Sequence, residues 1–209
     1  TRTTDTQNSD SNVPNLNSSR GFEGMAISPD KSIIYPLLEG TVFGDPIGTL
    51  RIYRFNPTSR KLEGIQGYYK LENQNHAIGD FTVINQNEYL VIERDNEQAE
   101  KAKFKKIFKI NLSRKDANNL VEKEETVDLL NISDPRNLSR TNQKIFRFPF
   151  QTIENVLVID AKTILVANDN NYPFSIGRPP NIDNTEMILL TLPKPLAIDQ
   201  RVGLAGLSR

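Results

Sequence analysis

The sequence predicts an all-β fold, in particular a partial β-propeller of about three mainly four-stranded antiparallel blades. One short unit, made of an apolar strand, a tight turn and a second apolar strand, occurs three times along the chain, and a further apolar run follows each copy. A fixed order of short strands that recurs every several tens of residues is typical of radial repeats, for which the propeller is the usual all-β solution.

The clearest copy of the unit spans residues 151–172, where QTIENVLVIDAKTILVANDNNY places two apolar strands around a short turn. The same order recurs at residues 21–40 and 77–96, where SPDKS and NQN supply the turn chemistry. Third strands are predicted at residues 50–57, 105–113 and 187–195, and fourth strands at residues 60–71 and 122–130. Residues 145–150, IFRFPF, fit either a strand or a gate, and the chain after residue 192 shows no strong periodicity.

Composition divides the chain into a tail and one domain. Residues 1–19 are almost entirely polar, so they are expected to form a disordered tail or linker. Residues 20–209 are long enough to bury a core and are assigned to a single domain. The 26 basic and 26 acidic side chains balance, which disfavours nucleic acid as a partner. No apolar run approaches the length that spans a bilayer, so no membrane span is expected.

Several classes of chemistry lack their residues in this sequence. Without cysteine there can be no disulfide or thiolate site, and a single histidine, His76, makes a histidine-dependent triad improbable. His76 is expected to be an exposed loop residue rather than part of a site. The lysines of the second unit are expected to lie on a solvated loop and strand edge rather than in a phosphate site. They are Lys101, Lys103, Lys105, Lys106 and Lys109.

Carboxylates and amides at the ends of the apolar strands are the main candidates for a site. Glu23, Asp80 and Glu154 each lie where an apolar strand begins, so in blades they would converge at the mouth of the channel. Further oxygen donors follow the strands, namely Glu39, Glu93, Asp95, Asn168, Asp169 and Asn170. Calcium takes six to eight such oxygens, which predicts a calcium site. The alternative is that these acids are solvated or paired with Arg and Lys.

Four stretches within residues 20–192 carry a family resemblance, namely RGFEGMAISPDKSIIY, IGDFTVINQNEYLVIERDN, FKKIFKINL and QTIENVLVIDAKTILVANDNNYPF. They resemble the phytase-like family, also called esterase-like activity of phytase. The resemblance implies a β-propeller found in secreted, periplasmic or surface-attached bacterial proteins, and it implies hydrolysis of phosphoric esters. By position, the family's acidic motif places fall on Glu23, Asp80, Glu93, Glu154 and Asp169.

The resemblance leads to two competing functions. As a calcium-dependent phosphoesterase, the chain would bind its substrate through Arg94, Asn168, Asn170 and Arg178, with metal-activated water because no nucleophile is obvious. Alternatively, it is a non-catalytic binding module with structural calcium, or an inactive fragment. Family domains are longer, so the chain resembles their C-terminal part. Its partners would then be the remaining blades of a longer chain or another copy of itself.

Overall fold

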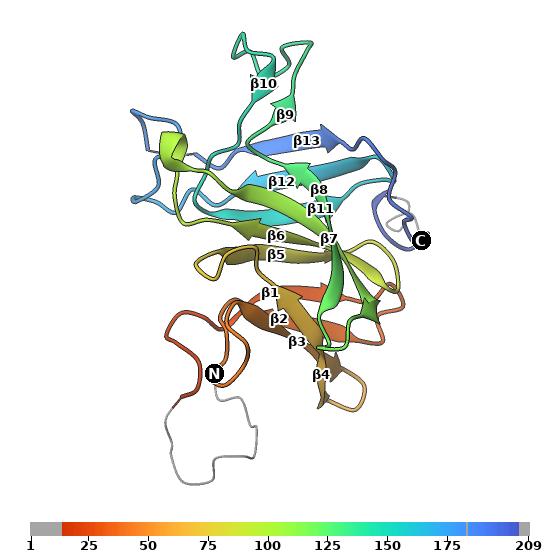
Figure 1. Cartoon of the computed structure of the whole chain (residues 1–209). Coiled ribbons are helices and arrows are strands. Elements are labelled where there is room, and N and C mark those ends of the chain that lie inside the picture. The colour runs from red at the N-terminus through yellow and green to blue at the C-terminus, as the bar shows by residue number, and fades with distance from the viewer. Residues whose placement is uncertain (1–13, 183, 205–209) are drawn as a thin grey trace.

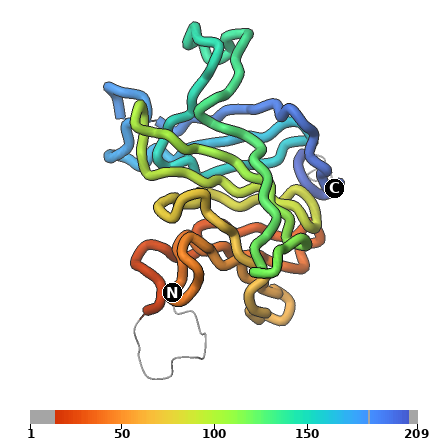
Figure 2. Tube along the Cα trace, in the orientation of Figure 1, coloured from red at the N-terminus to blue at the C-terminus, as the bar shows by residue number. Residues whose placement is uncertain are grey.

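The computed structural model describes residues 14–182 and 184–204, and it confirms the all-β prediction. Figure 1 shows three larger antiparallel sheets stacked one on another, with the second sheet between the first and the third. A small two-stranded sheet projects beyond the third sheet at the top of this view. The chain builds the three sheets in sequence order, from orange through yellow and green to blue in Figure 2.

The first and second sheets each contain four strands in chain order. The strands of the first sheet are β1 (Phe22–Ile27), β2 (Ile34–Leu38), β3 (Thr49–Asn56) and β4 (Lys61–Lys70). Those of the second are β5 (Ala77–Val83), β6 (Glu88–Arg94), β7 (Lys105–Lys115) and β8 (Val121–Asp128), with a short 3₁₀ helix, η1 (Ala99–Lys101), before β7. The fourth strands predicted near residues 60–71 and 122–130 are therefore confirmed.

The third sheet has only three strands among the described residues. They are β11 (Ile153–Val158), β12 (Thr163–Asn168) and β13 (Met187–Thr191), again in chain order. Between the second and third sheets, β9 (Ile132–Ser133) pairs with β10 (Ile145–Phe146), so the IFRFPF segment begins with a short strand. After β13 the described chain forms no further strand, as its lack of periodicity predicts, yet Leu196 and Val202 are buried in the core.

The turns between the first two strands of each sheet share one chemistry. The Asp30 carboxylate accepts the Ser32 N–H at 3.0 Å, and Asn85 Oδ1 accepts the Glu88 N–H at 2.9 Å. In the third sheet, the Asp160 carboxylate accepts the Lys162 N–H at 2.7 Å. Short acceptor side chains stabilise tight turns by bonding backbone two or three residues ahead, which is why SPDKS and NQN end strands here.

Two apolar cores lie between the three sheets. One core contains Leu37, Ile52 and Tyr69 of the first sheet packed against Phe81 and Tyr89 of the second. The other core joins the second sheet to the third and includes the fully buried Phe148 and Phe150. Because the second sheet contributes buried side chains to both cores, it is the element that positions the other two.

The first strands of the three sheets pack side by side, and glycines allow the contact. β5 lies against both β1 and β11. A Cβ added to Gly24 would lie 2.6 Å from Cβ of Phe81, and one added to Gly79 would overlap the carbonyl oxygen of Ile153. Glu23, Asp80 and Glu154 do lie on these three strands, as predicted. The three N-terminal strand ends are thereby brought to one region of the molecule.

The predicted tail is described only from residue 14 onward, and residues 1–13 lie outside the described part. Leu16 packs against Leu38, Val42 and Tyr53 of the first sheet. The Phe43 N–H donates to the Asn15 carbonyl at 2.7 Å. Residues 14–19 therefore cover part of the outer face of the first sheet. Across the described ranges, no helix is long and apolar enough to cross a membrane.

Candidate functional site

The candidate site is built from two strand positions that repeat in the three sheets. The first is a β-bulge in the first strand, which contains Glu23 in β1, Gly79 and Asp80 in β5, and Glu154 in β11. Bulges re-aim side chains and are over-represented beside functional sites. Two of the three bulges thus place a glutamate at the same end of β1 and β11, the two strands that flank β5.

The second position lies at the end of the second strand of each sheet. It follows the residue that pairs with the first strand just before the bulge. Leu38, Glu93 and Asn168 pair with Phe22, Ile78 and Ile153, and the next residues along these strands are Glu39, Arg94 and Asp169. The Glu39 and Asp169 N–H groups donate at 2.8 Å to the carbonyl oxygens of the residues just before β1 and β11, Gly21 and Thr152, and Arg94 pairs with Ala77. The central sheet therefore carries an arginine where its two neighbours carry acids.

These positions together form what we call the Arg94 cluster: Glu23, Glu39, Arg94, Glu154 and Asp169, with Arg20 at its margin. An Arg94 Nη2 atom lies 3.9 Å from Glu154 Oε1, and an Arg20 nitrogen lies 3.3 Å from Glu39 Oε1. Only 8% of the Arg94 side chain is exposed, against 28% for Glu154. Four carboxylates thus surround two guanidinium groups, which leaves the cluster with an excess of negative charge.

Two carboxyl groups of this cluster, those of Glu39 and Glu154, are held in an unfavourable environment for charge. Burial raises the pKa of Glu154, the Arg94 charge opposes this shift, and Glu23, Asp169 and Glu39 add to it. Burial likewise raises the pKa of Glu39, again against the effect of Arg20. Carboxyl groups with raised pKa values in a partly open site are candidates for proton transfer, because they gain and lose a proton closer to neutral pH.

The hydrogen-bond donors of the Arg94 guanidinium group are incompletely satisfied. Its Nη1 donates to Asn96 Oδ1 at 3.0 Å, but the buried Nε has no hydrogen-bond partner among the described residues. A buried donor without an acceptor costs free energy, so such groups in native proteins require a reason. Because this Nε is buried, a ligand oxygen would become its acceptor only after the groups that cover it move aside.

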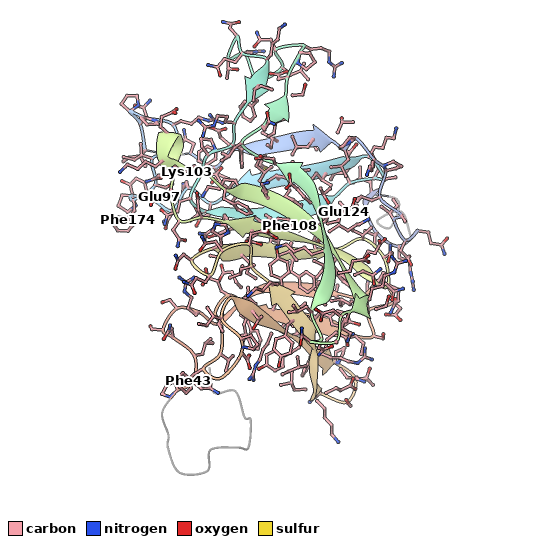
Figure 3. The ribbon with its side chains drawn as sticks, in the orientation of Figure 1. Phe43, Glu97, Lys103, Phe108, Glu124 and Phe174 are labelled. Carbon is pink, nitrogen blue, oxygen red and sulfur yellow. The ribbon has the colours of Figure 1, made fainter. Side chains whose placement is uncertain are left out.

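Glu93, the neighbour of Arg94 on β6, belongs to a different arrangement that we call the Glu93 cluster: Glu93, Tyr69, His76 and Lys123. The Glu93 carboxylate is fully buried and accepts hydrogen bonds from Tyr69 Oη, the Glu72 N–H and Lys123 Nζ, each at 2.7 Å. Lys123 Nζ also lies 3.9 Å from the ring centre of Phe108, near the middle of Figure 3. Protein groups therefore account for the buried charge of this predicted metal ligand.

His76 corrects the expectation of an exposed loop residue. It does precede β5 in a loop, but only 11% of its side chain is exposed. Its Nδ1 lies 2.8 Å from Glu93 Oε1, and its ring stacks on Phe104 with ring centres 4.2 Å apart. The partner that the sequence did not identify is thus a carboxylate seventeen residues further along the chain.

Asp80, the third predicted bulge acid, is bonded to backbone groups and is not among the charges that act on Arg94. One carboxylate oxygen accepts the Phe81 N–H at 2.7 Å, and the other accepts the Val156 N–H of β11 at 2.8 Å. Burial raises the pKa of Asp80, and these two bonds oppose the shift. The carboxylate joins the second sheet to the third, which gives it a structural role independent of any metal.

The predicted substrate-binding residues other than Arg94 are engaged within the protein. Asn168 is buried and accepts the Glu186 N–H at 2.7 Å, and Asn170 Oδ1 accepts the Tyr172 N–H at 3.2 Å. Arg178 donates to Glu186 at 2.6 Å and lies over the rings of Phe146 and Phe150. It lines a separate pocket of about 260 Å³ with Arg147 and Phe146. The structure thus does not bring Arg178 to Arg94.

The lysine prediction holds at Lys101 and Lys103, which are exposed, but is wrong for Lys105. The Lys105 side chain is fully buried, and its Nζ lies 2.7 Å from Asp95 Oδ1 and 2.8 Å from the carbonyl oxygens of Asp95 and Glu97. Sequence reasoning also missed Arg20 and Lys123 as members of the two clusters. The only available signal was their position beside strands rich in acids, and it does not reveal a partner in another sheet.

A calcium site is not preformed in the described part of the chain. No group of three or more His, Cys, Asp or Glu side chains there is arranged to hold a metal ion. In the Arg94 cluster a guanidinium group stands among the carboxylates. The exposed Glu23 and Asp169 and the half-buried Glu154 leave carboxylate oxygens open to an additional cation.

Of two comparisons with known proteins, one found a match. No curated protein matches the chain. A family model described as "Phytase-like: Esterase-like activity of phytase" matches residues 2–172. Because the matched region includes all of β1 to β12 and well over half of the sequence, the chain belongs to the phytase-like family.

Proposed function

We propose that the protein is a phosphoric ester hydrolase and that the Arg94 cluster is its substrate site. The observation that carries the proposal is the buried Arg94 side chain, whose Nε has no acceptor within residues 14–182 and 184–204, in a cluster where two sheets repeat the same acidic positions. A phosphate oxygen would supply that acceptor, and guanidinium groups bind phosphate well. Family membership supports the same substrate class.

In this proposal Arg94 and Glu154 have separate roles. Arg94 binds and orients a phosphate oxygen and stabilises the charge that develops during the reaction. Glu154, with its raised pKa, takes the proton of the attacking water as the new P–O bond forms. The ester P–O bond then breaks, and the leaving alkoxide takes the proton back from Glu154 to depart as the alcohol. Glu93, which directly precedes Arg94 on β6, takes no part because its oxygens are already bonded within the protein.

We further propose that calcium joins the site together with the substrate. Excess negative charge in the Arg94 cluster would repel a phosphate unless a cation intervenes. Glu23, Glu154 and Asp169 would contribute oxygens, and the cation, when bound, would neutralise phosphate charge. The three stacked sheets fit our proposal of a partial propeller in which β1, β5 and β11 are the innermost strands. An extracellular or periplasmic location remains the expectation from the family.

A second candidate function is a binding module without turnover. It is favoured by the complete hydrogen bonding of Asp80, Glu93 and Asn168, which leaves few polar groups free to take part in chemistry. Such a module would bind a phosphorylated ligand at Arg94 without cleaving it. Turnover therefore has to be separated from binding.

The test measures phosphate release and binding in parallel. Release is followed from p-nitrophenyl phosphate and from phytate, with calcium or with EDTA, and binding of inorganic phosphate is measured by calorimetry. Loss of a general base typically lowers the rate by about 10²–10⁴-fold, so Glu154→Gln should lower kcat by that order. Arg94→Lys should weaken substrate binding because a bidentate guanidinium is lost.

The matched control is Glu97→Gln, because Glu97 is exposed and its carboxylate is not among the charges that act on Arg94. Figure 3 places Glu97 at the end of the molecule that carries η1. Glu97→Gln should leave release unchanged. Binding without release, in all conditions, would favour the binding module, and loss of neither binding nor release in Arg94→Lys and Glu154→Gln would exclude this site.

A further inference from the structure

The outer edge of the third sheet differs from those of the first two. Among the described strands, β13 pairs only with β12. The Leu192 N–H donates to Lys162 and the Glu186 carbonyl accepts from Asn168, so these two residues point toward β12. Alternate residues of an antiparallel strand point their backbone groups in opposite directions. Met187, Leu189 and Thr191 therefore present their N–H and C=O groups at the free edge.

The sequence of β13 is not that of a protected edge. Natural edge strands are commonly blunted by charged side chains or proline, which prevent pairing with another chain. β4 carries Lys61, Glu63 and Lys70, and β8 contains the charged run EKEE. β13 reads MILLT, without charge or proline, and Met187 and Leu189 are 68% and 66% exposed. By its composition β13 resembles an inner strand of a sheet, which pairs with another strand on each side.

A groove runs beside β13 and could receive that strand. It has a volume of about 910 Å³ and lies between β13 and the chain around β8 and β9. Its apolar lining includes Ile132, Ile188 and Leu190. Its charged lining contains Asp128, Asp134 and Arg136, together with Glu186, which is already paired with Arg178. The groove therefore combines apolar surface, unpaired backbone groups and net negative charge.

We propose that the β13 edge binds an extended segment of another polypeptide, in which apolar and basic side chains alternate. Its backbone pairs with Met187, Leu189 and Thr191 and completes a fourth strand, as β4 and β8 do in the other sheets. Its apolar side chains face the lining of the groove, and its basic side chains face the acids. This site is separate from the Arg94 cluster and does not depend on the proposed hydrolase activity.

The undescribed ends of this chain do not have the required chemistry. Residues 1–13 contain a single aliphatic side chain, Val13, and residues 205–209 read AGLSR. Neither segment alternates apolar and basic residues. The acids of the groove lining are the ground for choosing a basic segment of another polypeptide as the occupant, and pairing of β13 with β13 of a second copy is a separate outcome that the test distinguishes.

The test uses a fluorescein-labelled peptide, Lys-Val-Lys-Ile-Lys-Val-Lys, and the whole chain at physiological salt. A twin peptide carries N-methyl groups on the backbone nitrogens that would face β13, so it keeps its side chains but loses the edge hydrogen bonds. Because several edge hydrogen bonds are lost, the twin should bind roughly tenfold or more weakly. Fluorescence anisotropy gives both dissociation constants.

The protein variant is Leu189→Lys, which adds a repelling charge at an exposed position of β13. The matched control is Leu62→Lys on β4, where the side chain is 51% exposed. Leu189→Lys should weaken binding at least about tenfold, because it imitates the edge protection of β4 and β8, and Leu62→Lys should not. Circular dichroism checks that both variants fold.

Three results would overturn the proposal. Equal binding of the two peptides would mean attraction to surface acids without strand pairing. Equal binding by wild type and Leu189→Lys would place the peptide elsewhere. Absence of peptide binding, together with a dimer in ultracentrifugation that Leu189→Lys abolishes, would identify a second copy as the occupant instead.

Discussion

Glu93 and Arg94 are adjacent on β6, but their side chains belong to opposite kinds of environment. Glu93 is fully buried and is bonded by Tyr69, His76, Lys123 and a backbone N–H. Arg94 is almost as deeply buried, yet its Nε is left without an acceptor among groups of the described chain. In a strand that is buried on both faces, one residue can thus stabilise the packing of two sheets, and the next residue can contribute to a binding site.

This comparison separates burial from function. A buried charge whose bonds are complete holds the fold together, because every partner would be left unsatisfied by its loss. A buried charge whose bonds are incomplete indicates a place for something that is not part of the chain. The predictions that follow test whether the two clusters differ in this way, from the largest effect to the smallest.

Breaking the Glu93 cluster should have the largest effect on stability. Lys123→Met removes the cation that lies 2.7 Å from the Glu93 carboxylate and leaves that buried charge uncompensated. The free energy of unfolding should fall by about 3–5 kcal/mol. Urea denaturation at neutral pH measures the change.

A surface ion pair on the same sheet provides the control. Lys106 Nζ lies 2.7 Å from Glu125, but both side chains are more exposed than Lys123 and Glu93. Lys106→Met should therefore cost no more than about 1 kcal/mol. If the two lysine variants cost the same, the Glu93 cluster does not hold the first two sheets together.

Calcium should act on the Arg94 cluster alone. At about a hundredfold over Kd, a ligand that binds only the folded state adds close to 3 kcal/mol to its stability. Calcium should therefore raise the melting temperature, EDTA should reverse the effect, and Glu154→Gln should reduce it. Scanning calorimetry of wild type, Glu154→Gln and Glu97→Gln provides the measurement, and an identical response in all three would remove Glu154 from the set of ligands.

Removing the histidine of the Glu93 cluster should cost less than removing its lysine. His76→Phe keeps a ring against Phe104 but loses the polar contact to Glu93 at 2.8 Å. A hydrogen bond to a charged group contributes about 1.5–3 kcal/mol, and the loss should fall near the lower end because the other bonds to Glu93 remain. Urea denaturation again measures it. A variant as stable as wild type would show that His76 only fills space.

The smallest expected effect is a gain in the free energy of unfolding, whereas the variants of the Glu93 cluster lose stability. Burial raises the pKa of Glu154 above 4.5, so the folded state binds the proton more tightly than the unfolded state. The stability due to the protonated form is present below the unfolded pKa and is lost as the pH rises through the folded pKa. Glu154→Gln should match wild type near pH 4 and exceed it at pH 7 by no more than about 1 kcal/mol.

The check is the difference in the free energy of unfolding between Glu154→Gln and wild type, followed from pH 4 to pH 7. Glu97→Gln should show no such trend. A Glu154→Gln variant that loses stability as the pH rises would mean that the ionised carboxylate is favourably paired in the fold.

The strands could be predicted because their signals are local. Apolar runs and the turn residues Asp30, Asn85 and Asp160 lie within a few positions of one another, and they fix the hairpins at the start of each sheet. The third unit was predicted without a fourth strand for the same reason. Its sequence contains no suitable run after β13.

The sequence could not predict which strand-end acids line the site and which are bonded within the fold, because the causes are not local. The partners of Glu93 come from β4 and β8, and Asp80 is bound by a backbone group of β11 seventy-six residues away. β6 is apolar or buried along nearly its whole length, so its periodicity does not separate its two faces. Strand-end acids therefore indicated the region of the site, and tertiary contacts decided which of them line it.

The close approach at Gly79 means that an uncharged position sets the electrostatics of the Arg94 cluster. Glu154 follows Ile153, whose carbonyl oxygen occupies the space that a Gly79 side chain would need. Even a methyl group there would wedge β5 and β11 apart and carry Glu154 away from Arg94. The affinity and pH response of the Arg94 cluster could therefore change through substitutions that leave every charged residue unchanged, and a search for altered function confined to acids and bases would overlook them.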